Sequence, residues 1–402
     1  IVVTGSVDLG SATLTLAATT FTPTAGDEFI IVSNDGTADA VVGTFDGLAE
    51  GAEVGTPGDF LGSSQSAYIT YRGGDGNDVA IIVAGAFSVA STAGDDDFTI
   101  TRIGTGAASD ILRITDGGGN IVESRPISAI TGAITIDAQA GNDSLTVDTD
   151  GSGGFFSATI NFDGEGNTGV GDDLAFIATD PGAASPIEFD SFTVDHVNLT
   201  DGTVTIVEGG DTLTVNYVNI EPITSTINAT NVTLNYSAAA ETITVSASGA
   251  QTEVDSDVGE IVTFNNPSTL LTINSGGGND VIDVQSFGSG FAASVGINGQ
   301  AGDDTLTIGL GGAFTTVTHN FASQTDGSVE LVNGGTTNLA YTGLEQINDN
   351  ATAVDRVMNY ATTADDATLS EGASSGDDIS RLESVYSNVT LDFKNPTSEL
   401  TV

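Results

Sequence analysis

The stretch GTVTIVEGGDTLTVNYVNIEPI, from Gly202 to Ile223, decides the fold class, because a closely similar stretch returns later in the chain. The second version runs from Gly327 to Ile347 and reads GSVELVNGGTTNLAYTGLEQI. A pattern that returns along a chain predicts an architecture of stacked units. Proteins built this way act mainly through shape and surface, so the repeat favours a structural or binding protein over an enzyme.

Strand patterns dominate the rest of the chain. β-Branched residues alternate with polar ones in several short runs, and Gly, Asn and Asp separate these runs. The clearest runs are Ala12–Leu16, Ile134–Asp137, Val204–Val207, Thr242–Val245 and Thr305–Ile308. The nearest approach to a helical stripe is Asp349–Tyr360, and it is weak. We therefore predict an all-β protein.

Two all-β architectures fit short strands with polar turns. One is a parallel β-solenoid (β-helix) built from tandem multi-coil repeats, with coils of about 25 residues. The alternative is a row of tandem antiparallel β-sandwich domains. Because few runs are joined by two-residue Asn-Gly turns, the solenoid is favoured.

The repeat divides the chain into four parts. Residues 1–85 form an opening β unit, 86–222 repeat copy 1, 223–348 repeat copy 2, and 349–402 a truncated copy 3. Neither end carries the polar cap that a solenoid needs. We expect strands left open in this way to pair with a continuation of the chain or with another subunit.

Composition and charge exclude several classes. The chain holds 55 acidic residues against 7 lysines and arginines, giving a formal charge of −48. This balance predicts no nucleic-acid partner, since phosphate binding needs a positive surface. There is no cysteine, which excludes disulfides and thiolate chemistry. The lack of a long apolar run predicts no membrane insertion. Abundant Thr, Ser, Asn, Asp and Gly are typical of secreted, extracellular proteins of the bacterial cell surface.

One turn motif carries the candidate chemistry. It is a Gly, then Asn or Asp, then Asp, followed by a hydrophobic strand, as in GGDGNDVAI (Gly73–Ile81) and GQAGDDTLTI (Gly299–Ile308). Calcium prefers carboxylate and carbonyl oxygens, and glycine lets the backbone converge on an ion. The predicted metal ligands are Asp75, Asn77, Asp78, Asp95, Asp96, Asn142, Asp143, Asp172, Asp173, Asn279, Asp280, Asp303 and Asp304. The alternative is ordinary turn chemistry, in which Asx side chains bind backbone amides.

These turns resemble the RTX nonapeptide GGxGxD of calcium-binding secreted bacterial proteins. Gly73, Gly74, Gly76 and Asp78 match its glycines and its aspartate. Each motif here stands alone, whereas the family repeats it in tandem, so the resemblance implies isolated calcium turns and not a β-roll.

A wider resemblance covers most of residues 1–348. The phrase ITYRGGDGNDV, from Ile69 to Val79, is similar to the phrase that ends units in large repetitive bacterial cell-surface proteins of the autotransporter-passenger-like kind. That resemblance implies a secreted, modular surface or matrix protein, and it implies no reaction.

The expected function is a structural protein of the cell surface or extracellular matrix, which self-assembles into a fibre, sheath or layer stabilised by calcium. One alternative is an adhesin segment that binds glycans or cells. The other is a β-helix enzyme, a polysaccharide lyase or glycosidase. The only basic group in the sequence that would suit acidic sugars is Arg72, Arg102, Arg113 and Arg125. We expect no catalytic residues.

Overall fold

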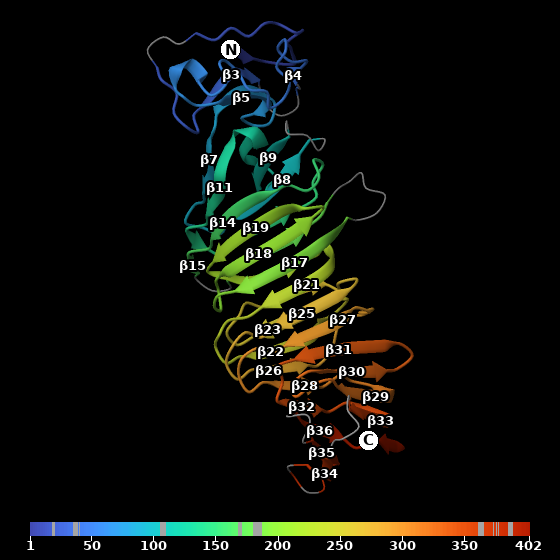
Figure 1. Cartoon of the computed structure of the whole chain (residues 1–402). Helices are drawn as coiled ribbons and strands as arrows, with labels where there is room; N and C mark the ends of the chain where they lie inside the picture. The colour runs from blue at the N-terminus through green and yellow to red at the C-terminus, as the bar shows by residue number, and fades with distance from the viewer. Residues whose placement is uncertain are drawn as a thin grey trace. The chain divides into compact units, whose positions relative to one another are not determined.

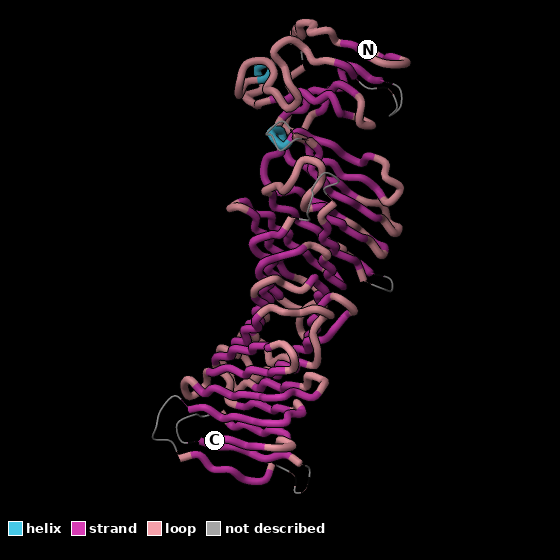
Figure 2. Tube along the Cα trace, turned by 90° about the vertical axis from the view of Figure 1, so that its right-hand side faces the viewer, coloured by secondary structure: helices cyan, strands magenta, loops and turns pink. Residues whose placement is uncertain are grey.

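The computed structural model describes two compact units (Figures 1 and 2). The described residues are all of 1–402 except 18–20, 35–38, 40, 105–109, 168–170, 180–186, 361–365, 373, 375, 377 and 385–388. Unit 1 comprises Ile1–Ile187 and Gly210–Ile220, and unit 2 comprises Glu188–Gly209 and Glu221–Val402. In the described ranges the regular structure is β-strand, apart from the short 3-10 segments η1 (Phe60–Gly62) and η2 (Ile127–Ala129).

Unit 1 begins with a small sheet of its own. Its strands lie in the order β1 (Val2–Val3), β3 (Glu28–Asn34), β6 (Asp78–Val83) and β5 (Ala67–Gly73). All six residues of β6 are buried, and Val79 and Ile81 pack with Phe60 and Ile69 in one core. A second pair, β2 (Val7–Asp8) and β4 (Val41–Val42), is parallel.

The rest of unit 1 is built from stacked coils that alternate between two sheets. One sheet has the order β7 (Gly85–Ala90), β11 (Ile130–Asp137), β14 (Ala158–Asp163) and β19 (Asp211–Val218), all parallel. The other has the order β10 (Ile121–Pro126), β9 (Ile111–Asp116), β8 (Asp97–Ile103), β13 (Ser144–Asp148) and β16 (Asp172–Ile177). Two short strands, β12 (Ala140–Gly141) and β15 (Gly166–Asn167), join successive turns.

Unit 2 repeats this plan. Its first sheet has the order β20 (Ile220–Ser225), β24 (Val262–Asn265), β23 (Gln251–Ser256), β22 (Thr242–Ser248), β26 (Val281–Val284), β28 (Thr305–Ile308), β32 (Gln346–Asp349), β36 (Thr390–Lys394), β35 (Ile379–Ser384) and β34 (Ala367–Glu371). Its second sheet has the order β18 (Gly202–Glu208), β17 (Glu188–His196), β21 (Asn228–Asn235), β25 (Leu270–Asn274), β27 (Ser294–Asn298), β31 (Thr336–Thr342), β30 (Gly327–Val332), β29 (Ala313–Phe321), β33 (Thr352–Tyr360) and β37 (Glu399–Thr401).

The predicted solenoid is confirmed. Each coil contributes parallel strands to both sheets, and the alternating apolar side chains face inward. In β28, for example, Leu306 and Ile308 are buried while Thr305 and Thr307 are half-buried. Four of the five predicted runs are strands. Ala12–Leu16 is not, so that prediction is wrong, and the weak helical candidate contains strand β33.

The coils differ in length from the expected value of about 25 residues, because some of them contain an insertion. Three-stranded antiparallel meanders lie within the sheets, as in β22–β23–β24 and β29–β30–β31. Two reversals restore the original strand direction, so the parallel stacking continues after each meander. The second version of the opening repeat runs through β30 and β31, two strands of such a meander.

Asparagine side chains join successive coils at the ends of the unit 2 strands. The Asn274 amide donates to Asn235 at 2.6 Å, and the Thr342 hydroxyl donates to Asn298 at 2.7 Å. Asn298 in turn donates to Asn274. Stacked amides of this kind satisfy each other from coil to coil, which is a known stabilising feature of in-register β-structures.

A buried ionic cluster lies among the coils of unit 2. Arg356, Asp349 and His319 are each fully buried. His319 Nε2 lies 2.9 Å from Asp349 Oδ2, Arg356 also donates to this carboxylate, and the Arg356 Nε donates to the Lys394 carbonyl at 2.7 Å. Burial opposes ionisation of Asp349, but the His319 hydrogen bond and the nearby positive charges outweigh it and lower its pKa.

Replacing Arg356 should therefore destabilise the protein strongly. We expect R356M to lower the free energy of unfolding by about 3–5 kcal/mol, because it leaves the Asp349 carboxylate buried without its cation. Urea unfolding monitored by circular dichroism measures this. The control is R381M, which breaks the more exposed Arg381–Asp392 pair and should cost about 0–1 kcal/mol. Equal losses in the two variants would contradict the interpretation.

Candidate functional site: stacked acidic turns

The predicted acidic turns of unit 2 stack into a ladder of carboxylates. Strand register places Glu241, Asp280, Asp304 and Glu345 at equivalent positions, each just before a strand of the first sheet. The backbone amide of Glu241 donates to Asp280 Oδ1 at 2.9 Å, and that of Asp280 donates to Asp304 Oδ1 at 2.8 Å. The amide of Asp304 donates to Glu345 Oε2 at 2.7 Å. The carboxylates of Asp280, Asp304 and Glu345 thus each accept from the coil before them.

Unit 1 contains the same ladder. The amide of Asp96 donates to Asp143 Oδ1 at 2.7 Å, and the amide of Asp143 donates to Asp172 Oδ1 at 2.6 Å. In the opening sheet, the amide of Asn34 donates to Asp78 Oδ1 at 2.7 Å. The residues joined in this way lie 24 to 47 positions apart in the sequence, so the ladder keeps coils of unequal length in register.

The main chain explains why a carboxylate is needed here. The carbonyl of each ladder residue accepts a normal inter-strand bond, for example from the Thr305 amide to the Asp280 carbonyl at 2.8 Å. The amide of the ladder residue, however, faces the turn of the next coil, which precedes the strand of that coil. The Asp side chain supplies the acceptor that the backbone lacks there, and a buried amide without one is costly.

Glycine allows the turns to stack this closely. Gly302 and Gly278 both have positive φ, and a Cβ on Gly302 would lie only 1.4 Å from the Gly278 carbonyl oxygen. No other residue fits at that contact. The approach of one turn to the next therefore requires the glycine of the motif at Gly141, Gly278 and Gly302, where a Cβ would lie within 3 Å of the neighbouring turn's backbone.

Burial and mutual repulsion shift the carboxyls of Asp143, Asp172 and Asp304 toward their neutral form. Burial, opposed by one backbone hydrogen bond and reinforced by neighbouring carboxylates, raises the pKa of Asp172 and of Asp304 to about 6. The same causes raise the pKa of Asp143. The second oxygens of Asp143 and Asp304 are buried and accept no hydrogen bond from the residues that the structure describes.

The first member of each acidic pair forms an outer, more exposed row. The Asn142 amide donates to Asp95 Oδ1 at 2.9 Å, and the Asp303 amide donates to Asn279 Oδ1 at 3.1 Å. Two further predicted ligands lie elsewhere. The Asn77 side chain donates to the Asp39 carbonyl at 2.8 Å, and Asp75 lies in an exposed turn beside Arg113.

Asp173 differs from its predicted position. The register pairs Ser144 with Asp173, so Asp172, the first residue of β16, is the residue equivalent to Asp143, and Asp173 is the second residue of that strand. Two ladder members were absent from the predicted set. Neither of them belongs to a Gly-Asp turn motif in the sequence. Glu345 lies four residues after the buried Tyr341, and Glu241 follows three alanines. Only the strand register reveals them.

The oxygen chemistry of the ladder fits a hard cation such as calcium. Asp304 Oδ2, which accepts no hydrogen bond within the described residues, packs closely against Gly299, where a Cβ would come within 2.6 Å of it. Within the described ranges, no three His, Asp or Glu side chains already converge as a metal-binding cluster. The turns therefore offer rows of oxygens along the coils.

Comparison with models of known protein families finds no match. A search of curated proteins likewise finds no relative of this chain. None of the helical segments in the described part of the chain has the length and apolar character that a membrane crossing needs.

The ladder predicts different effects for two substitutions of Asp304. Both D304N and D304A remove the charge, but D304N keeps an acceptor for the Asp280 amide. We expect D304N to be the more stable by about 1–3 kcal/mol at every pH, as measured by urea unfolding. D303A, in the outer row, is the control and should change stability by less than about 0.5 kcal/mol. Equal stability of D304N and D304A would contradict the ladder role.

The ladder also predicts an unusual pH dependence. A carboxyl whose pKa is about 6 when folded and near 4 when unfolded binds its proton more tightly in the folded state. Its ionisation therefore costs stability above pH 6, and the cost disappears as the pH falls toward 4. D304N should accordingly gain about 1–2 kcal/mol over the parent at neutral pH and nothing near pH 4. A gain that does not change with pH would contradict this explanation.

Proposed function

We propose that this chain is a structural segment of a secreted bacterial surface or matrix protein, stabilised by calcium and able to assemble with further copies into a fibre, sheath or layer. The observation that carries the proposal is the acidic ladder, which occurs in both units and holds stacked coils in register. The polar groups of the ladder serve the stacking, and this arrangement suits a protein that acts through shape.

Calcium would act on the charge that the ladder accumulates. The outer-row oxygens of Asp95, Asn142, Asn279 and Asp303 and the second oxygens of Asp143 and Asp304 are the candidate ligands. A divalent cation near them would relieve the repulsion that raises the carboxyl pKa values. The formal charge of −48 adds a general attraction for cations along the chain.

Assembly is supported by the strands at the sheet edges. In unit 2, β34 pairs with β35 alone among the described strands, and all five of its residues are exposed, including Leu369 at 51 %. An exposed edge strand presents unpaired amides and carbonyls to another chain. Strand addition at such an edge would continue the same parallel or antiparallel stacking.

Calcium should raise the melting temperature by mass action, because the turns converge only in the folded state. We expect millimolar calcium to stabilise the protein at neutral pH, reversibly with EDTA, and to have a smaller effect near pH 5, where Asp172 and Asp304 hold protons. Differential scanning calorimetry measures this, with magnesium as the control cation. An unchanged melting curve would remove calcium from the proposal and leave the surface role standing.

Assembly can be examined separately by negative-stain microscopy and light scattering with calcium and with a chelator. We expect filaments or layers in calcium. Replacing Leu369 and Thr368 in the exposed edge strand by lysine should reduce assembly, since edge lysines oppose strand addition. Monodisperse monomers in millimolar calcium would refute self-assembly for this chain.

A further inference from the structure

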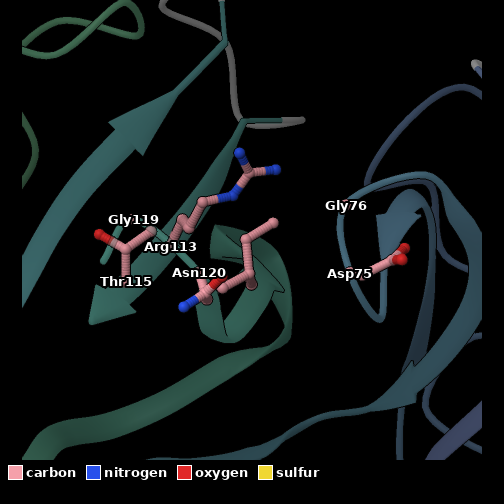
Figure 3. Close-up of a pocket in the computed structure, with 7 residues that line it drawn as sticks. Asp75, Gly76, Arg113, Thr115, Gly119 and Asn120 are labelled. Carbon is pink, nitrogen blue, oxygen red and sulfur yellow. The ribbon is translucent and has the colours of Figure 1, made fainter. Parts of the chain in front are cut away.

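A second site, unrelated to the ladder, lies in unit 1 where the opening sheet meets the first coil. A cavity of about 500 Å³ opens there, lined by Asp75, Gly76, Arg113, Thr115, Gly119, Asn120 and Ile121. Figure 3 shows Arg113 extending from β9 toward the turn that carries Asp75 and Gly76. The volume lies within the range of small-molecule binding sites.

Within the described part of the chain, Arg113 has no ion-pair partner that explains its position. Among the residues that the structure describes, ion pairs hold Arg102, Arg125, Arg356 and Arg381, but none holds Arg113. Its Nε is buried and donates no hydrogen bond within the same residues. Burial, together with the positive charge of nearby Arg72, lowers the pKa of the Arg113 guanidinium. A cation placed in this way is stabilised by an incoming anion.

The shape of the cavity depends on Gly76. This residue has a φ of +110°, and a Cβ on it would lie 2.7 Å from Ile121 Cδ1 and 3.5 Å from Arg113 Nη2. The missing side chain therefore lets this turn pack directly against Ile121 and lie close to the guanidinium. Leu112 and Ile114, on either side of Arg113 in β9, are buried in the coil, so the strand fixes the direction of the arginine.

The other polar groups restrict the anion. Thr115 and Asn120 line the cavity on the side of Arg113, and Asp75 lies on the opposite side, with its exposed carboxylate directed away from the guanidinium in Figure 3. A planar carboxylate matches the two-pronged donor of arginine. Asp75 would repel a second negative charge, but it accepts hydrogen bonds from hydroxyl groups. A ligand with one carboxylate on a ring of hydroxyls meets both requirements.

We propose that this cavity binds the uronic-acid units of an acidic polysaccharide, with Arg113 holding the carboxylate and with the sugar ring lying in the space lined by Thr115, Asn120 and Asp75. The site adds a glycan-binding activity to the proposed structural role and does not depend on calcium. Long-range repulsion from the acidic chain is screened at physiological ionic strength, where the Debye length is about 8 Å, and so a local contact of this kind can form.

The test is calorimetric titration of the full chain with a short oligogalacturonate. EDTA is present throughout, so that calcium cannot bridge the acidic protein to the acidic sugar. We expect binding of the oligogalacturonate, and at least about tenfold weaker binding of its methyl ester, which lacks only the charge. The ester control needs no mutation and therefore stays informative if a variant fails to fold.

The matched variants are R113Q and R381Q. R113Q removes the positive charge in the cavity, and R381Q removes one positive charge from the Arg381–Asp392 ion pair, which is not part of the cavity. R113Q should lose binding at least about tenfold, while R381Q should bind as the parent does. Three results would overturn the proposal: no binding of oligogalacturonate by the parent, equal binding by a folded R113Q, or equal binding of the methyl ester. A polyglutamate peptide that competes as well as the sugar would overturn the saccharide assignment.

Discussion

The structure depends on one local constraint, which is the amide that begins each strand of the ladder-bearing sheet. This amide faces the turn of the next coil, where no backbone carbonyl is aligned to receive it. In both units an acidic side chain takes the place of that carbonyl, as Asp304 does for Asp280 and Asp172 does for Asp143. The glycine turns follow from this bond, because the carboxylate reaches the amide only when successive turns lie almost in contact.

Two sets of side chains connect the coils, and they differ in charge. At the ends of the second-sheet strands of unit 2, asparagine amides donate and accept in a neutral chain. Before the first-sheet strands, carboxylates do the joining, although an asparagine there would offer the same acceptor without the cost of burying charge. The choice of aspartate leaves a second oxygen unsatisfied at Asp143 and Asp304. A proton satisfies it, which gives the ladder a sensitivity to pH that the amide chain lacks, and the proposed calcium would act on the same oxygens.

Much of the fold follows from local patterns that act over a few residues. Alternation in Thr242–Val245 and Thr305–Ile308 predicts strands because one face of each is buried. Coil length does not follow, since an inserted meander adds strands with the same alternation as the coil itself. The ladder residue Glu241 carries no local signal at all, because its role is set by Asp280, 39 positions later. Ala12–Leu16 alternates in the same way as the confirmed strands but forms none in the structure.

The ion pairs of the arginines distinguish those with a structural role from Arg113, for which we propose a binding role. With 55 acidic residues against 7 basic ones, any exposed guanidinium has carboxylates within easy reach. Arg102, Arg125 and Arg381 use this abundance, and Arg356 pairs with a carboxylate even in the core. Arg113 instead points across a cavity, with a second arginine near enough to oppose its charge. In so acidic a chain, such an arrangement persists only where the fold holds carboxylates away from the cation. The strand β9 and the Gly76 turn do this, and they leave a space in which an external carboxylate completes the pair.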